Sequence, residues 1–199
     1  SGGEASSGLY VRGGSPDQNL ILLDGVPVYN ASHLFGFFSV FNSDALSNVK
    51  LIKGGFPARY GGRASSVIDI RLKEGNMRNF NMEGSLGLIS SKLLVEGPII
   101  EDKLSFAVSG RRTYLDILAS PFIAAFGNGA KAGYFFHDYN AKLQYKINER
   151  HRLFLSGYFG KDKVYVEDRY TGSPQLGNGG FEDVFAVNMQ WGNEIGALR

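Results

Sequence analysis

The chain has 199 residues, with 21 basic and 19 acidic side chains, no cysteine, 27 glycines and 13% aromatic residues. The nearly balanced charge and the absence of a long basic cluster argue against a nucleic-acid-binding surface, and the absence of cysteine excludes disulfides, thiolate catalysis and cysteine-ligated metals. The abundance of glycine and aromatic residues, with only 6 prolines, predicts a mainly β chain of strands and turns.

Short apolar segments joined by glycine-rich turns fill the first part of the chain. Residues 9–12 and 19–23 read as strands separated by a Gly-Gly-Ser-Pro-Asp turn. Ser43 can cap a short helix, and residues 49–52 and 66–72 read as further strands. The segment that follows, residues 74–78, is polar, and we place a domain boundary there.

Longer segments with alternating apolar and polar residues follow, and we count six, around residues 80–88, 91–97, 104–111, 135–146, 152–159 and 185–191. Segments of roughly ten residues with one apolar and one polar face are typical of an outer-membrane barrel wall. A soluble antiparallel sheet with one wet face alternates in the same way.

The connections between these segments favour the barrel. Short turns at residues 97–102 and 148–150 alternate with long connections at residues 113–133 and 161–182, and a membrane barrel likewise has short turns at one rim and long loops at the other. Ile89-Ser90 would be a tight hairpin at the outer rim. Tyr145 and Trp191 would belong to an aromatic girdle near the inner rim. The apolar run at residues 117–126 is too short for a membrane-spanning helix, which needs about 20 residues.

Several short motifs occur in an order that resembles the plug domain of TonB-dependent outer-membrane receptors. They are Val11-Arg12-Gly13, the leucine-rich strand Leu20 to Gly25, the segment Ser43 to Lys53, the pair Gly54-Gly55, and Tyr60-Gly61. The amino-acid sequences around Arg12 and Tyr60 most resemble those of the receptor subgroup that has an extra N-terminal carboxypeptidase-regulatory-like domain.

The resemblance implies an α+β plug in residues 1–75, followed in residues 76–199 by the first six or so antiparallel strands of a transmembrane β-barrel. Plugged barrels of this kind have about 22 strands, and single-chain bacterial barrels begin at about eight. The sequence starts in polar residues without a signal peptide, which a secreted receptor needs. We therefore expect the chain to be part of a larger receptor.

The resemblance also implies a substrate site at the outward apex of the plug. Aromatic rings beside a few polar groups suit sugars, peptides and metal chelates alike. Alternatively, the phenylalanine side chains fill the space between plug and barrel. The implied substrate-binding residues are Arg12, Tyr29, Asn30, His33, Phe35, Phe37, Phe38 and Phe41.

Charged residues that join plug and barrel are a second implied set. In relatives a basic residue before the glycine pair, usually arginine, pairs with barrel carboxylates; the lysine found here, Lys53, cannot make the bidentate pair. Ordinary solvated charge in a wet barrel interior is the alternative. The implied plug–barrel residues are Lys53, Arg59, Arg63, Asp138, Asn140 and Lys142.

No catalytic pattern accompanies these motifs, so we predict that the protein is not an enzyme. The three histidines, His33, His137 and His151, lie in different elements, and the sequence contains no Gly-x-Ser-x-Gly nucleophile motif. The glycine pairs are not followed by Gly-Lys-Ser/Thr, which excludes a phosphate loop. We expect neither a cofactor nor a metal site.

The function that these expectations support is import across the outer membrane of a Gram-negative bacterium by energised movement of the plug. The implied partners are a TonB-type energy-transducing protein bound through an upstream segment, outer-membrane lipid, and a siderophore, glycan or peptide substrate. A surface lipoprotein lid is a further partner that the resemblance allows. The alternative is a barrel that serves as a structural scaffold without transport; a passive porin is disfavoured by the plug itself.

Overall fold

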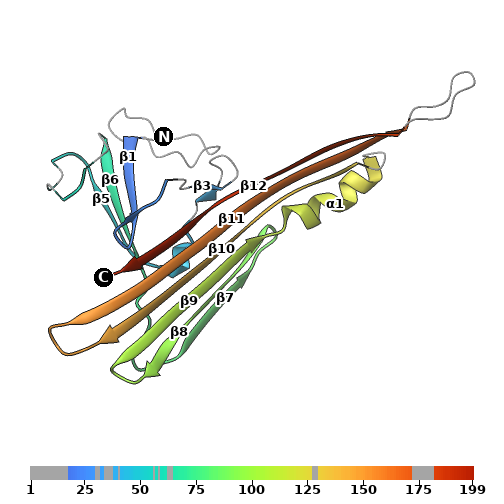
Figure 1. The fold of residues 1–199 in the computed structure, drawn as a ribbon. Coiled ribbons are helices and arrows are strands. Elements are labelled where there is room, and N and C mark those ends of the chain that lie inside the picture. The colour runs from blue at the N-terminus through green and yellow to red at the C-terminus, as the bar shows by residue number, and fades with distance from the viewer. Residues whose placement is uncertain are drawn as a thin grey trace, which may run out of the picture.

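The computed structural model describes residues 18–29, 32–33, 38–39, 41–55, 57, 59–61, 65–126, 130–171 and 182–199, and the statements below concern these residues. The architecture consists of a small sheet near the N-terminus and a large sheet formed by the C-terminal part of the chain (Figure 1). We refer to them as the N-terminal sheet and the C-terminal sheet.

The N-terminal sheet has four strands in the order β2-β1-β6-β5. Its strands are β1 (Asn19–Leu23), β2 (Val26–Pro27), β5 (Leu46–Ile52) and β6 (Ser66–Leu72). Strands β1 and β6 are parallel, whereas β1 and β2 form a tight hairpin through Asp24 and Gly25. Both turn residues have positive φ, 49° and 93°, which explains the Asp-Gly pair in the sequence.

Short elements connect β2 to β5. Strands β3 (Ser32–His33) and β4 (Phe38–Ser39) pair antiparallel, and the 3₁₀ helix η3 (Ser43–Ala45) precedes β5. The helix cap is Asn42, whose side chain accepts a hydrogen bond from the Asp44 amide, and not Ser43 as expected. The cap precedes Ser43 because the helix is a single 3₁₀ turn that Ser43 itself begins.

The C-terminal sheet is an antiparallel meander of six strands in the order β12-β11-β10-β9-β8-β7, which confirms the predicted number. Its strands are β7 (Asn81–Leu86), β8 (Ser90–Ile100), β9 (Leu104–Thr113), β10 (Lys131–Lys146), β11 (Arg152–Thr171) and β12 (Glu182–Leu198). The tight hairpin before Ser90 and the short turn after Lys146 are also found.

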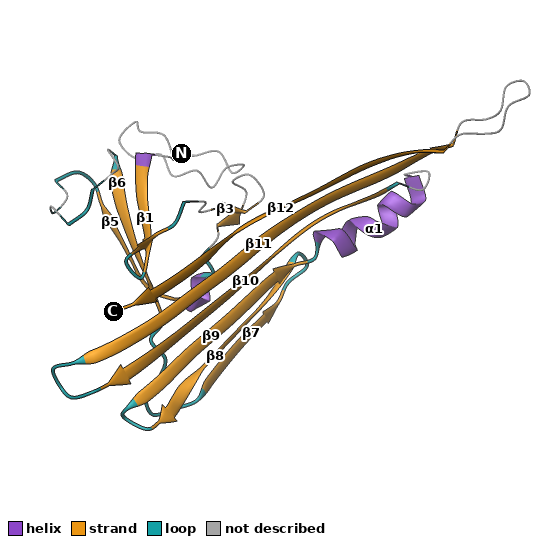
Figure 2. Ribbon diagram, in the orientation of Figure 1, coloured by secondary structure: helices purple, strands orange, loops and turns teal. Residues whose placement is uncertain are grey.

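Two of the predicted long connections differ from the structure. The segment 113–133 contains a helix, α1 (Leu115–Phe126), which packs against β10 and is the one long helix of the described residues (Figure 2). The predicted loop at 161–182 is strand up to Thr171, because β10 pairs with β11 as far as Glu167 and β12 pairs with it as far as Thr171. The polar composition of residues 161–171 had wrongly indicated a loop.

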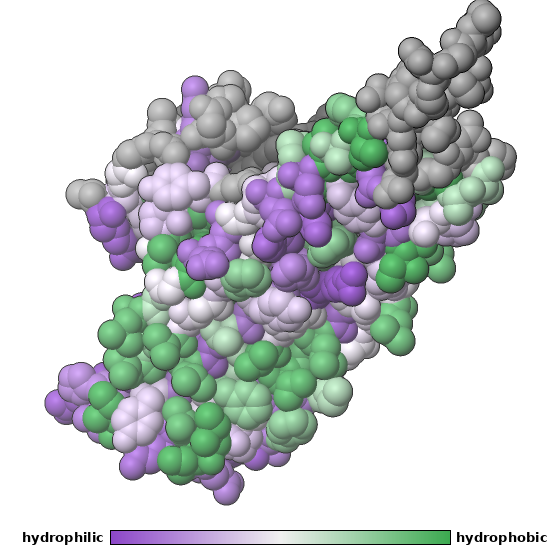
Figure 3. All heavy atoms as spheres, turned by 45° about the vertical axis from the view of Figure 1, so that its right-hand side comes forward, coloured by the Kyte–Doolittle hydropathy of each residue, from purple (hydrophilic) through white to green (hydrophobic). Residues whose placement is uncertain are grey.

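The C-terminal sheet has the reverse polarity of a sheet in a water-soluble protein. In β10 the polar side chains Asp138 and Lys142 are 0% and 2% exposed, whereas the apolar Tyr139 and Leu143 are 54% and 38% exposed. Figure 3 shows apolar side chains gathered over the lower part of the molecule. A soluble sheet would bury its apolar face, so this burial pattern favours the barrel wall over the soluble alternative.

The two aromatic residues expected in a girdle lie on opposite faces. Tyr145 belongs to the exposed apolar face. Trp191 pairs directly with the buried Asp162 and therefore lies on the polar face, contrary to the prediction. The register of β12 against β11 decides this, and the alternation within β12 could not reveal it.

The main apolar core lies in the N-terminal sheet and closes against the C-terminal sheet. Its members are Leu23, Val28, Ala45, Ile68, Ile70, Leu72 and, from β11, Tyr158. Ile195 of β12 packs against the same core. In the described part of the chain, no helix combines the length and apolar composition that crossing a membrane requires.

Candidate functional site

Polar side chains of the C-terminal sheet meet the N-terminal sheet at a buried contact. The side chains are held there by strict alternation along β9, β10 and β11, which directs every second residue to the same face. The buried polar residues of these strands are Ser105, Ser109, Thr113, Asp138, Asn140, Lys142, Gln144, Ser156 and Asp162. Buried polar groups need partners, and four of these residues, Ser105, Asp138, Lys142 and Asp162, have them in residues 1–75.

His33 of β3 is clamped between two aspartates of the C-terminal sheet. Its Nε2 lies 2.6 Å from Oδ1 of Asp138, and its Nδ1 lies 2.6 Å from Oδ2 of Asp162. The ring stacks on Phe136, with centroids 4.0 Å apart and planes 8° apart. His33 is 2% exposed, so the clamp is closed to solvent.

Further donors complete the clamp. Arg111 of β9 donates from Nε to Asp138 at 2.7 Å, and the Tyr158 hydroxyl donates to the other oxygen of Asp138 at 2.9 Å. The Tyr134 hydroxyl donates to Asp162. Arg111 also donates to the backbone carbonyl of Ser39 in β4, at 2.7 Å. The β3–β4 hairpin is therefore bound at two points.

The two aspartates favour the protonated form of His33. A neutral imidazole has one N–H, and only the doubly protonated ring can donate to a carboxylate from each nitrogen. Burial by itself lowers the pKa of His33, but the hydrogen bonds and negative charge of Asp138 and Asp162 outweigh it and raise the pKa above the ordinary 6.5. The clamp is a desolvated cation held by two anions.

We expect attachment of the β3–β4 hairpin to weaken at alkaline pH. Because the pKa of His33 is raised in the attached state, its contribution is complete below pH 6.5 and is lost as pH rises through the raised pKa. Hydrogen exchange of β1 and β6 amides, measured in the full-length protein across that range, should accelerate with pH beyond the intrinsic rate increase. A His33→Gln variant should lack this extra acceleration; if it keeps it, His33 is not the titrating group.

A second buried contact joins Lys142 to the β1–β2 turn. The Lys142 Nζ lies 3.0 Å from Oδ1 of Asp24 and donates to the carbonyl of Leu72 at 3.0 Å. It also lies 5.4 Å from the centre of the Phe154 ring. Asp24 and Lys142 are both buried, so this is an ion pair removed from water.

A third contact joins η3 to β8 and is partly open to water. The Lys92 Nζ lies 2.6 Å from Oδ2 of Asp44. The hydrogen bond from Lys92 holds the pKa of Asp44 below its ordinary value. Because both side chains are about a third exposed, we expect this pair to contribute less than the two buried contacts.

The predicted substrate residues differ in their exposure to solvent. Tyr29 is 86% exposed, whereas His33 is buried in the clamp and Phe41 packs against the core of the N-terminal sheet. Only the backbone of Phe38 is described. The remaining four predicted substrate residues, Arg12, Asn30, Phe35 and Phe37, lie outside the described residues.

The predicted plug–barrel residues also differ: some make buried contacts and others are exposed. Asp138 and Lys142 make the buried contacts above, and Asn140 lies between them on the same face, near Ala45 and Leu72. Lys53 is exposed, and Arg59 is exposed with a hydrogen bond to the neighbouring Tyr60 hydroxyl. Arg63 lies outside the described residues.

Sequence reasoning missed several members of the contact, namely Asp24, Asp44, Lys92, Arg111, Tyr158 and Asp162. Charged residues at alternate positions of an otherwise apolar strand could have indicated Lys92 and Arg111. Nothing in the sequence pairs them with particular residues of the first domain. Within the described residues, no group of three or more histidines, aspartates and glutamates is placed to hold a metal ion.

Comparison with known families finds a match for the first part of the chain. Residues 1–68 match the model of the TonB-dependent Receptor Plug Domain family. No curated protein matches the chain. That family is one of receptors and not of enzymes, in agreement with the sequence-based expectation.

Two solved structures show the same fold. The siderophore receptor PirA from Acinetobacter baumannii aligns with a TM-score of 0.53 and 19% identity, over 84% of this chain and 32% of that chain. The siderophore receptor PirA from Pseudomonas aeruginosa aligns with a TM-score of 0.51 and 17% identity, over 96% of this chain and 37% of that chain. The chain thus spans about a third of the length of these receptors. Residues 1–68 thus match the plug domain of the TonB-dependent receptors, and the chain as a whole has the fold of about a third of a siderophore receptor.

Proposed function

We propose that the chain is part of a receptor in the outer membrane of a Gram-negative bacterium, and that this receptor imports a substrate by movement of its plug. The observation that carries the proposal is the reversed polarity of the C-terminal sheet. Its apolar face is exposed, as lipid requires, and its polar face binds the plug through His33 and Lys142. A wall of this kind is suited to a plugged, water-filled barrel.

The contacts of the plug suit a part that is held firmly and then moved. The contacts made by His33, Asp24 and Asp44 are ion pairs, which water can replace once the groups separate, and Tyr158 and Ile195 add a smaller apolar contact. A TonB-type partner acting through an upstream segment would supply the work that shifts the plug between two states. In this scheme His33 serves attachment and not substrate contact, because both of its ring nitrogens are occupied.

The substrate proposal rests on Tyr29 and the aromatic segment around it. Tyr29 is an exposed residue of the plug and is available to a ligand. Arg12, Asn30 and the phenylalanines of residues 35–41 stay in the proposed substrate set. Siderophores, glycans and peptides are the classes to test, and ferric siderophores come first because both similar structures are siderophore receptors.

Other parts of the proposal concern the larger receptor. We propose that Lys53, Arg59 and Arg63 contact barrel strands other than β7 to β12, and that the domain boundary lies near residue 75. Two further proposals rest on the motif sequences alone. They are membership of the subgroup with a carboxypeptidase-regulatory-like domain, and a surface lipoprotein lid. A scaffold with a fixed plug is the competing function.

A reversible crosslink between plug and barrel separates transport from scaffolding. The pair Asp44→Cys and Lys92→Cys replaces two side chains that lie 2.6 Å apart, and the chain has no other cysteine. A short bifunctional thiosulfonate should join them through two reducible disulfides. Cells that express this receptor variant are grown with ferric siderophores as the iron source, or with oligosaccharides or peptides as the carbon source.

Growth on the substrate that the receptor imports should stop after crosslinking and return after reduction, because a tethered plug cannot leave the barrel wall. Each single-cysteine variant, treated with the same reagent, controls for modification alone. Growth that continues despite complete crosslinking would contradict plug movement at this wall and favour the scaffold.

A further inference from the structure

The outward face of the C-terminal sheet carries ordered rows of side chains, because residues directly opposite in an antiparallel sheet share a face. One row contains Tyr139 and Phe159, which pair directly and are 54% and 37% exposed. Exposed aromatic side chains at one level of a membrane barrel mark the boundary between lipid tails and headgroups. On the side toward the short turns, the outward residues Leu143 and Leu155 are apolar and exposed.

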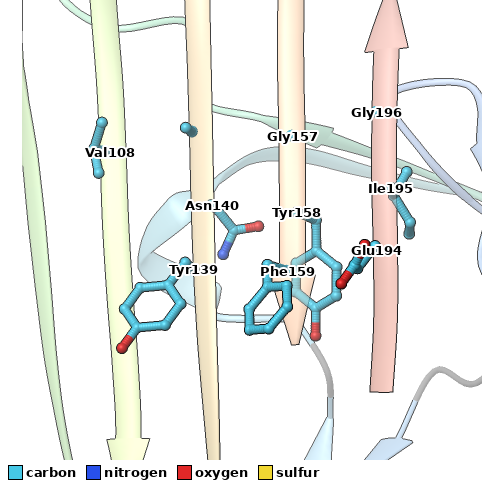
Figure 4. A pocket seen from close by; sticks show the side chains of 10 residues that line it. Val108, Tyr139, Asn140, Gly157, Tyr158, Phe159, Glu194, Ile195 and Gly196 are labelled. Atoms are coloured by element: carbon cyan, nitrogen blue, oxygen red, sulfur yellow. The ribbon is translucent and has the colours of Figure 1, made fainter. Parts of the chain in front are cut away.

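A hollow lies in this apolar surface, immediately below the aromatic row. The next row consists of small residues from four adjacent strands, Val108, Ala141, Gly157 and Gly196. They line a shallow hollow of about 520 Å³ with the aromatic row at its edge. In Figure 4, Val108, Gly157 and Gly196 lie at one level across the strands, and Tyr139, Phe159 and Glu194 at another.

A basic row lies on the other side of the aromatic row. It contains Arg112, His137 and Lys161, which pair directly across β9, β10 and β11, and Lys163 follows on the same face of β11. Arg112 is half exposed and lies 3.6 Å from the Asp116 carboxylate of α1. Among the described residues, neither Lys161 nor Lys163 has an anionic partner within salt-bridge distance.

The spacing of these rows matches the dimensions of a lipid. The basic row is two residues beyond the aromatic row and four beyond the hollow, which correspond to roughly 7 Å and 13 Å along a strand. Positive charge directly outside an aromatic girdle complements the phosphate of a lipid headgroup. An apolar hollow below the girdle complements an acyl chain, which reaches from the headgroup into the membrane.

We infer that this face is a binding site for a lipid with a phosphate headgroup, with one acyl chain in the hollow and the phosphate at Lys161 and Lys163. Arg112 stands at the end of the same row and can turn from Asp116 toward the phosphate. The inference rests on the proposed membrane location of the barrel, and it assigns to the barrel wall a ligand that is separate from the imported substrate. A protein partner is less suited, because the hollow lies within the apolar band that faces lipid.

Lipid retention by the full-length receptor, purified in mild detergent, tests the site. Native mass spectrometry measures binding of dioleoyl phosphatidic acid and of dioleoylglycerol, which has the same acyl chains but no phosphate. We expect phosphatidic acid to bind at least roughly tenfold more tightly, since each lysine near an anionic headgroup contributes about 1 kcal/mol. The K161Q/K163Q variant should lose this preference. The matched control Lys50→Gln removes an exposed lysine of the plug strand β5 and should keep it.

A second variant tests the hollow. A Cβ at Gly196 meets no atom within 4 Å, so Gly196→Leu introduces a side chain into the hollow without a clash at Cβ. It should weaken binding of both lipids. Equal binding of the two lipids to the unchanged receptor, or an unchanged preference in K161Q/K163Q, would overturn the phosphate site; displacement by inorganic phosphate would overturn lipid as its occupant. Unchanged binding in Gly196→Leu would overturn the acyl site.

These outcomes are independent of transport. The proposed function fails if the Asp44–Lys92 crosslink leaves growth unchanged, whereas the lipid site fails through retention of the two lipids. A receptor that transports but shows no phosphate preference would therefore contradict only the lipid inference.

Discussion

The His33→Ala variant of the full-length receptor should lose most of the attachment between the β3–β4 hairpin and the barrel wall. The substitution leaves Asp138 and Asp162 buried without the cation that lies between them. Removing one partner of a buried ion pair costs about 3 to 5 kcal/mol, because the remaining charge stays desolvated. Arg111 and Tyr158 still donate to Asp138, and Tyr134 still donates to Asp162, so the aspartates lose the cation but keep these hydrogen bonds.

Hydrogen exchange of the purified receptor measures this loss. Amides of β1 and β6 should exchange roughly a hundredfold faster below pH 6.5, where His33 is fully protonated in the unchanged receptor. Amides of β9 and β10 report in the same experiment whether the barrel itself is intact. The matched control is His151→Ala, which removes an exposed histidine whose contacts are with the nearby Asn148. Equal exchange in both variants would show that His33 does not hold the plug.

The Lys142→Met variant should be the second most damaging to plug attachment. It removes the cation from Asp24 and the donor from the Leu72 carbonyl, and both acceptors are enclosed by the core. Methionine has a similar length and keeps the packing beside Phe154, so the loss is mainly electrostatic. We expect a destabilisation of about 3 kcal/mol or more, as for other broken buried pairs.

A double-mutant cycle separates the pair from its surroundings. Asp24→Asn retains a residue that tolerates the positive φ of the turn, and it removes the negative charge. The Asp24→Asn, Lys142→Met double variant should recover much of the stability that Lys142→Met loses, because no buried charge remains unpaired. Plug stability is measured by hydrogen exchange of β1 and β6 amides. Additive losses from the two single changes would show that Asp24 and Lys142 act independently.

Most strands of the fold could be predicted from local sequence patterns. Dyad alternation located β7 to β12, and the Asp24-Gly25 pair located the β1–β2 hairpin. Both signals are local, since alternation reports one strand and a turn needs particular residues. The helix α1 and the extension of β11 to Thr171 were not predicted, because packing against β10 decides the helix and pairing with β10 and β12 decides the strand.

Only part of the contact between the N-terminal segment and the C-terminal sheet could be predicted from the sequence. Asp138 and Lys142 stood out as polar residues on alternating positions, and in the structure they contact His33 and Asp24 of the N-terminal part of the chain. His33 was assigned to substrate because the resemblance to the receptor family places the segment after the Asp-Gly strand at the apex of the plug. Its partners are more than a hundred residues away in the chain, and no local pattern could have named them.

The sequence by itself determined the order of motifs, the mainly β class and the two-faced strands, because these follow from short-range spacing and turn chemistry. Alternation alone leaves open which face of a strand is buried, and both a soluble sheet and a membrane barrel satisfy it. Only the tertiary structure decided this, by placing the plug on the polar face and leaving the apolar face open. The same placement paired His33, Asp138 and Asp162, since ion pairs between distant segments depend on register and docking and not on spacing along the chain.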